Sequence, residues 1–155
     1  MVKKSWTEKL NGGKDLPKVV NINKKLSKVW GKGTCVIPAP REVDALMRRV
    51  PHGRLVTIND IRAKLAKRHH ATIACPITTG IFARIAAGAA EEATERGEKK
   101  VTPYWRTLKK GGVLNEKYPG GIEGQSRLLE KEGHVIQQKG GRHSVICYEK
   151  NLARL

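Results

Sequence analysis

Apolar residues recur at the spacing of an α-helix in several stretches of the chain. One stripe consists of Val43, Leu46, Met47 and Val50 and predicts a helix of about ten residues. Another amphipathic helix is predicted at about residues 122–131. Both patterns indicate a core built mainly from helices.

Two further helices are predicted between these. Thr57 and Asp60 have the spacing of a capping box, so a helix should follow Thr57. After Pro76, Thr78 or Thr79 can cap a third helix, whose alanine- and glycine-rich interior permits close packing. Two helices joined by a turn form the outline of a helix-turn-helix, although helical hairpins without a DNA-related role share that outline.

Two β-rich runs close the chain. Residues 134–138 and 143–148 flank Gly140-Gly141, which predicts a hairpin, and a hairpin after helices resembles a wing. We therefore expect an α+β fold, mainly α, with a winged helix-turn-helix domain at residues 39–149 and a tail at residues 150–155.

Residues 1–38 have a different composition. They carry nine lysines against Glu8 and Asp15, and no periodic apolar pattern runs through them. Pro38 and Pro40 then impose an extended break. We expect a basic N-terminal arm that is only partly ordered.

Charge limits the classes of partner. The 155 residues include 31 Lys and Arg against 14 Asp and Glu, a formal net charge of +17. Such an excess favours a polyanion, with double-stranded DNA ahead of an anionic membrane surface. No apolar run approaches the roughly 20 residues that cross a bilayer, and no secretory signal pattern is present. We expect a monomer in the cytoplasm, associated with the nucleoid.

The three cysteines indicate neither a disulfide framework nor a metal site. Cys35, Cys75 and Cys147 are widely spaced and form no CxxC pair. Cys75 lies near His69 and His70, but a buried free thiol beside two solvated histidines is the simpler interpretation. We expect no cofactor and no bound metal.

Four motifs, taken in order, carry a family resemblance. They are Val50-Pro51-His52-Gly53-Arg54, Pro103-Tyr104-Trp105-Arg106, Tyr118-Pro119-Gly120-Gly121 and Leu128-Leu129-Glu130-Lys131-Glu132-Gly133. Over about residues 41–134 the chain resembles the DNA-binding domain of the O6-alkylguanine-DNA alkyltransferases. In that family a Pro-Cys-His-Arg motif holds the nucleophilic cysteine.

This chain departs from the family at the reactive position. Tyr104 stands in place of the cysteine and Trp105 in place of the histidine, so Glu132 has no histidine to orient. Alkyl transfer needs a thiolate of lowered pKa, and a phenol with a pKa near about 10 is a poor acceptor. We therefore predict no enzymatic activity.

The chain resembles the non-enzymatic alkyltransferase-like branch of the family. The resemblance implies recognition of O6-alkylguanine lesions in DNA by base flipping, followed by recruitment of nucleotide excision repair proteins. The expected lesion pocket consists of Tyr104, Trp105, Tyr118, Gly120 and Gly121. Its expected supports are Pro103, Arg106 and Glu132. The expected DNA-binding residues are Thr78, Thr79, Arg84, Arg96, Lys109 and Lys110.

Alternatives remain at this stage. Ile58 replaces a family tyrosine and Arg96 replaces an asparagine, and Trp105 is as compatible with a core position as with a pocket. A general winged-helix DNA-binding module without lesion specificity is one alternative. An alkyltransferase that uses a displaced cysteine, Cys75, is the other.

Overall fold

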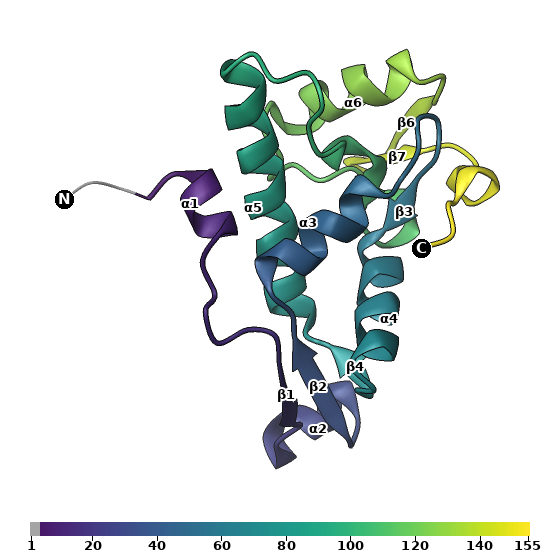
Figure 1. The fold of residues 1–155 in the computed structure, drawn as a ribbon. Helices are drawn as coiled ribbons and strands as arrows, with labels where there is room; N and C mark the ends of the chain where they lie inside the picture. The colour runs from purple at the N-terminus through teal and green to yellow at the C-terminus, as the bar shows by residue number, and fades with distance from the viewer. Residues whose placement is uncertain (1–3) are drawn as a thin grey trace.

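The long helix α5 (Pro76–Glu95) runs through the middle of the molecule, and the other elements pack around it (Figure 1). This computed structural model describes residues 4–155. The fold is mixed α/β, with small sheets beside the helices. The remaining helices are α1 (Trp6–Leu10), α2 (Lys24–Trp30), α3 (Pro40–Arg48), α4 (Ile58–Arg68) and α6 (Gly121–Lys131). The strands are β1 (Lys18–Asn21), β2 (Thr34–Ile37), β3 (Val56–Thr57), β4 (Ile73–Ala74), β5 (Thr107–Leu108), β6 (Ile136–Lys139) and β7 (Arg142–Val145).

The main core lies between α3, α4 and α5. The apolar stripe predicted for α3 is fully buried, with Val43, Leu46 and Met47 each at 0% exposure. Helix α4 begins with the predicted capping box, because Thr57 Oγ1 accepts from the Asp60 amide and the Asp60 carboxylate accepts from the Thr57 amide. Ile61 and Leu65 of α4 are buried against this core.

Helix α5 begins earlier than its threonines suggested, which corrects the predicted cap. Its N-cap is Cys75, and Pro76 occupies the first helical position. Proline is favoured there because its missing N–H would have no helical partner. Thr79 is fully buried and its hydroxyl donates to the Cys75 carbonyl at 2.6 Å. Thr78 and Thr79 therefore lie inside the helix.

The N-terminal segment also differs from the expected arm. Strand β1 pairs antiparallel with β2, and β2 pairs parallel with β4, which comes much later in the chain. Cys35 and Val36 of β2 are buried, and Leu10 of α1 is buried against the main core. Residues 1–3 of the predicted arm lie outside the described residues. Elements on both sides of residue 39 thus pair and pack with one another, and the domain boundary expected there stays a prediction.

A second apolar cluster joins the C-terminal elements. The predicted hairpin forms, with β6 antiparallel to β7. Val145 of this hairpin packs with Leu55, Leu108 and Leu129. The expected tail is paired too, because Leu55 donates to the Asn151 carbonyl and accepts from the Ala153 amide. Within residues 4–155, no helix is long and apolar enough to cross a membrane.

Candidate functional site

A cavity of about 800 Å³ lies beside the first half of α5. Helix α1, the start of α4, strand β5 and the loop before α6 supply its other walls. Its apolar lining includes Trp6, Ile58, Ile77, Ile81, Leu108 and Tyr118. Its charged lining consists of four cations, Lys9, Arg84, Lys109 and Lys117, and one carboxylate, Glu116. Cations thus border an apolar surface.

Pairing of two short strands places the walls on the α4 side. Strand β3 runs parallel to β5, with Thr57 opposite Leu108, and this register brings Leu108 beside the start of α4 at Ile58. Tyr118 reaches the same region from the loop before α6, and its hydroxyl donates to the Thr107 carbonyl at 3.2 Å. Burial raises the pKa of the Tyr118 phenol, so this residue stays neutral.

Helix α5 contributes two unusually exposed apolar side chains. Ile77 is 62% exposed and Ile81 is 50% exposed, and both line the cavity. They are four residues apart, so they lie on the same face of the helix. Gly80 lies between them in sequence, and a Cβ added there would meet nothing within 4 Å. This face of α5 is left open for a ligand that buries apolar surface.

Tyr104 does not line this cavity, although the sequence predicts it as a pocket residue. It is 4% exposed, and its ring makes an edge contact with Tyr118 at 5.4 Å between centroids. Burial, together with the nearby Glu91, raises the pKa of the Tyr104 phenol to about 12. Tyr104 therefore supports Tyr118 from inside the core.

Trp105 is likewise absent from the cavity lining, because its side chain turns to Glu132. The indole Nε1 donates to Glu132 Oε2 at 2.7 Å. Arg106 donates to the same carboxylate from Nε at 2.9 Å and from Nη2 at 2.8 Å, and the Gly53 amide donates at 2.9 Å. Glu132 therefore holds Trp105 and Arg106 in the absence of the histidine that the family has there.

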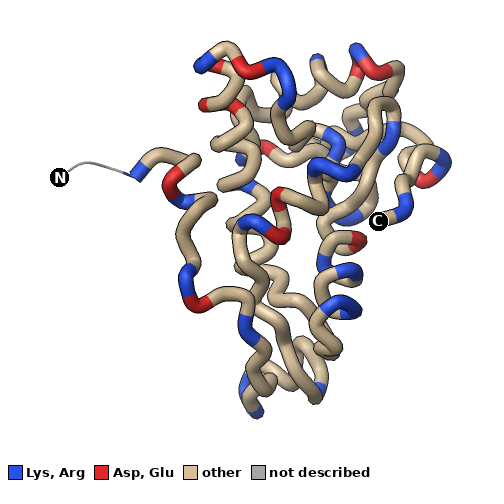
Figure 2. Tube along the Cα trace, viewed as in Figure 1, with Lys and Arg blue, Asp and Glu red and all other residues tan. Residues whose placement is uncertain are grey.

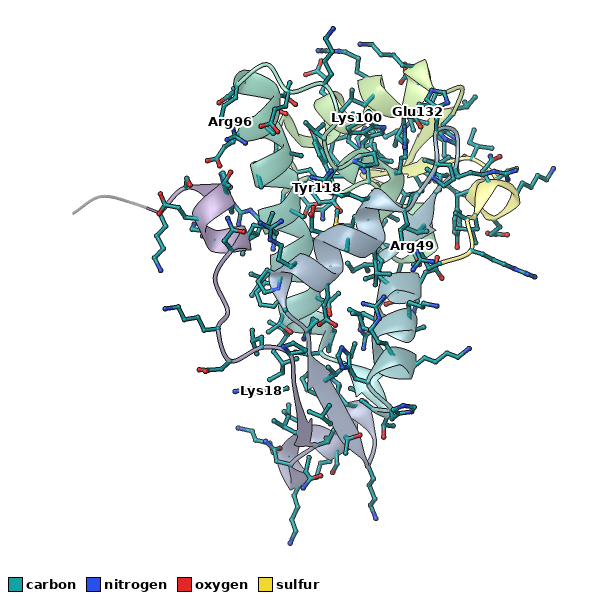
Figure 3. All side chains as sticks on the ribbon, in the orientation of Figure 1. Lys18, Arg49, Arg96, Lys100, Tyr118 and Glu132 are labelled. Carbon is teal, nitrogen blue, oxygen red and sulfur yellow. The ribbon has the colours of Figure 1, made fainter. Side chains whose placement is uncertain are left out.

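This network joins distant motifs of the chain. Arg106 Nη1 also donates to the Val50 carbonyl at 2.8 Å, so one guanidinium connects the end of α6 with the turn after α3. Burial alone would raise the pKa of Glu132, but the bonds from Arg106, Gly53 and Trp105 together lower it. The network is thus an ionised, structural centre. Figure 3 labels Glu132 and the cavity residue Tyr118.

The two glycines of the expected pocket have a backbone role. Gly120 and Gly121 have φ values of 82° and 64°, and Gly120 is the N-cap of α6. Neither lines the cavity. Pro103 is buried directly before the short helical turn Tyr104–Arg106. None of these three residues lines the cavity.

The six expected DNA-binding residues do not form one group. Arg84 and Lys109 line the cavity, where Lys109 also pairs with Glu116 at 3.2 Å. Lys110 lines an adjoining hollow of about 700 Å³ beside the hairpin, which shares Lys109 and Glu116 with the cavity. Arg96 caps the opposite end of α5 and pairs with Glu98 (Figure 3). The hydroxyl groups of Thr78 and Thr79 are buried, and neither residue lines the cavity or the hollow beside the hairpin.

Charge divides α5 along its length (Figure 2). Its first half carries Arg84 and no acidic residue, whereas Glu91, Glu92 and Glu95 lie in its second half. The cavity lies beside the first half. A phosphate backbone would therefore be attracted to the cavity side and repelled from the other end.

The cysteines offer no activated nucleophile at the cavity. Cys75 is 7% exposed and contacts Cys35, whose thiol pKa is raised mainly by burial. Neither residue lines the cavity. Within the described part of the chain, no group of three or more His, Cys, Asp and Glu residues could hold a metal ion.

Several lining residues were missed in the sequence. Trp6 and Lys9 belong to the segment interpreted as an arm, and Lys117 directly precedes the recognised Tyr118. Ile77 and Ile81 could have been found from the sequence. They are four residues apart on one face of a helix whose buried residues are mostly alanines, so these two isoleucines lie outside the core face. That signal depends on placing the helix start at Pro76.

Comparisons with known proteins give little further guidance. No family model matches the chain. No curated protein matches it either. Among solved structures, the crystal structure of S. pombe Atl1 in complex with damaged DNA containing O6-carboxymethylguanine is similar, at 16% identity and a TM-score of 0.49. The match covers 75% of this chain and 94% of that chain.

Proposed function

We propose that this protein binds double-stranded DNA and holds one extruded O6-alkylguanine-type base in the cavity without reacting with it. Holding the lesion flags it for removal by other repair proteins. The observation that carries the proposal is the cavity itself, where an apolar floor at Tyr118, Ile77 and Ile81 is bordered by lysine and arginine side chains.

The cavity has the size and chemistry that a nucleotide requires. Its volume of about 800 Å³ lies within the range of roughly 300–1,000 Å³ that is usual for ligand pockets. A base removed from the helical stack needs apolar or aromatic surface, and such contacts contribute about 1–3 kcal/mol for each base. The phosphates of the strand that carries this base need cations, which Lys117 and Arg84 supply.

The environment of Tyr104 supports binding without alkyl transfer. Its phenol is sealed in the core with a pKa raised to about 12, so the phenolate is scarce at neutral pH. Trp105 has no basic nitrogen to remove a proton, and its N–H is committed to Glu132. Cys75 is buried away from the cavity, which disfavours the alternative of a displaced nucleophile.

A competition assay tests the proposal. Matched duplexes carrying O6-methylguanine or guanine at one position compete for the protein at two salt concentrations. We expect the lesion duplex to bind at least about tenfold more tightly, which corresponds to about 1.4 kcal/mol. Equal affinities would favour the general DNA-binding module in place of a lesion sensor.

The same duplex tests the absence of chemistry. After incubation with DNA whose O6-methyl group is isotopically labelled, we expect the label to remain entirely on the DNA. Stoichiometric label on the protein would contradict the proposal and establish an alkyltransferase. Peptide mapping would then show whether Cys75, Tyr104 or another residue accepted the group.

A further inference from the structure

Helix α1 is fixed on α5 by specific contacts. The Glu92 carboxylate accepts from the Trp6 amide at 3.0 Å, from the Thr7 amide at 2.8 Å and from the Thr7 hydroxyl at 2.7 Å. The Trp6 ring lies against Gly88, where an added Cβ would come within 2.4 Å of it. The three hydrogen bonds to Glu92 and the contact of the Trp6 ring with Gly88 therefore determine where α1 lies.

The Trp6 ring gathers two cations at the edge of the cavity. Lys9 Nζ lies 4.4 Å from the ring centroid and Arg84 Cζ lies 5.5 Å from it. Both are within the distance at which an aromatic ring attracts a cation. Within residues 4–155, neither Lys9 nor Arg84 forms an ion pair. Two like charges beside one ring attract an anion.

A second hollow, which also contacts Trp6, carries carboxylates that would repel an anion. This hollow, of about 420 Å³, is lined by Glu91, Glu92 and Glu95. Trp6, Arg84 and Lys117 line both the acidic hollow and the cavity, so they mark the boundary between them. A phosphate near this boundary is repelled by the carboxylates and directed to the cavity side.

We infer that Lys9 and Arg84, held in place by Trp6, form a phosphate clamp for the DNA strand whose base enters the cavity. This inference rests on the proposed function, because the group that the clamp binds is a phosphodiester of the DNA backbone. Arg84 belongs to α5, whereas Lys9 is brought to the same place by docking of α1. The N-terminal helix thus supplies part of the binding site.

Salt titrations of duplex binding test the clamp. The variants are Lys9→Gln, Arg84→Gln and their combination, with Lys150→Gln as a control on the exposed C-terminal turn. The slope of log K against log salt should become shallower by about 0.9 for each phosphate that the variant no longer neutralises. We expect this change in both single clamp variants and no comparable change in Lys150→Gln. Slopes equal to that of the wild type in all of these variants would overturn the clamp.

The Glu92→Ala variant distinguishes the effect of α1 docking on DNA affinity from the effect of net charge. This variant removes a negative charge, so net charge alone predicts tighter DNA binding. The clamp predicts the opposite, a loss of about tenfold at low salt, because α1 loses the carboxylate that holds it. Alanine is compatible with the α5 helix, so the variant should fold. Tighter binding would overturn the inference.

The design also separates this inference from the proposed function. The slopes are measured on intact and lesion duplexes in parallel. A wild-type protein with no lesion preference would contradict the proposed function, while the slopes on intact duplex would still decide the clamp. If the wild-type protein bound neither duplex, both would be wrong.

Discussion

The indole N–H of Trp105 donates to Glu132 at 2.7 Å, and this bond fixes the side chain that the family resemblance placed beside a reactive centre. Arg106 and the Gly53 amide complete the set of donors around the carboxylate. A buried carboxylate with several donors is stable only while each donor remains. At the scale of single residues, this part of the chain is therefore specialised for structure.

Trp105→Phe tests the importance of that indole donor. The substitution keeps an aromatic ring but removes one hydrogen bond to a charged acceptor, so we expect a loss of roughly 2 kcal/mol in the free energy of unfolding. Urea denaturation measures it. Trp30→Phe, on α2, is the matched control, because Trp30 makes no side-chain hydrogen bond in the described chain, and its cost should stay below about 0.5 kcal/mol. Equal costs would contradict the network.

Glu132 should impose a pH dependence on stability. Its pKa is lowered in the folded protein, so its contribution is complete above the unfolded pKa of about 4.3 and is lost as pH falls through the folded pKa. Glu132→Gln should therefore cost about 3 kcal/mol at pH 7, and the difference from wild type should shrink below about pH 4. Glu98→Gln, an exposed control, should show little difference at either pH. A constant difference across this range would contradict the assignment.

Helix α5 carries two glycines with opposite environments. A Cβ at Gly80 meets open space, whereas a Cβ at Gly88 would lie 2.4 Å from the Trp6 ring. Gly80→Ala should therefore stabilise the protein by about 1 kcal/mol through helix propensity. Gly88→Ala should destabilise it despite the same propensity gain, because α1 must move. Thermal unfolding of the two variants measures the signs, and stabilisation by both would show that α1 does not dock at Gly88.

Local patterns predicted some elements and missed others for a physical reason. The stripe of α3, the capping box of α4 and the turn of the C-terminal hairpin are signals contained within a few residues. Strand β2 has no such signal, because its burial depends on pairing with β1 and with the distant β4. Lysine-rich flanks around Cys35 and Val36 made this segment resemble a solvated arm.

The candidate site shows the same limit. Tyr118 could be found from its motif, but the cavity also needs Trp6, which reaches it only through docking of α1 on Glu92 and Gly88. The family motif predicts Tyr104 in the pocket because it stands at the cysteine position, whereas its burial against Tyr118 follows from packing. Side-chain direction in such a turn depends on tertiary contacts that sequence spacing does not encode.

At the scale of the whole molecule, excess positive charge and one apolar cavity act together. A net charge of +17 attracts DNA of any sequence, and this attraction weakens steeply with salt. The acidic second half of α5 restricts where the backbone can lie, and the cavity beside the first half provides the selective feature that the proposal requires. Affinity and lesion preference should therefore respond to different substitutions.

Lesion preference in a pair of Gly80 variants is the most direct test. Gly80→Phe places a ring where the cavity is open, while Gly80→Ala makes the same backbone change without filling it. In competition between O6-methylguanine and guanine duplexes, wild type and Gly80→Ala should keep a preference of about tenfold or more, and Gly80→Phe should bind both duplexes equally. An undiminished preference in Gly80→Phe would contradict the claim that the base enters this cavity.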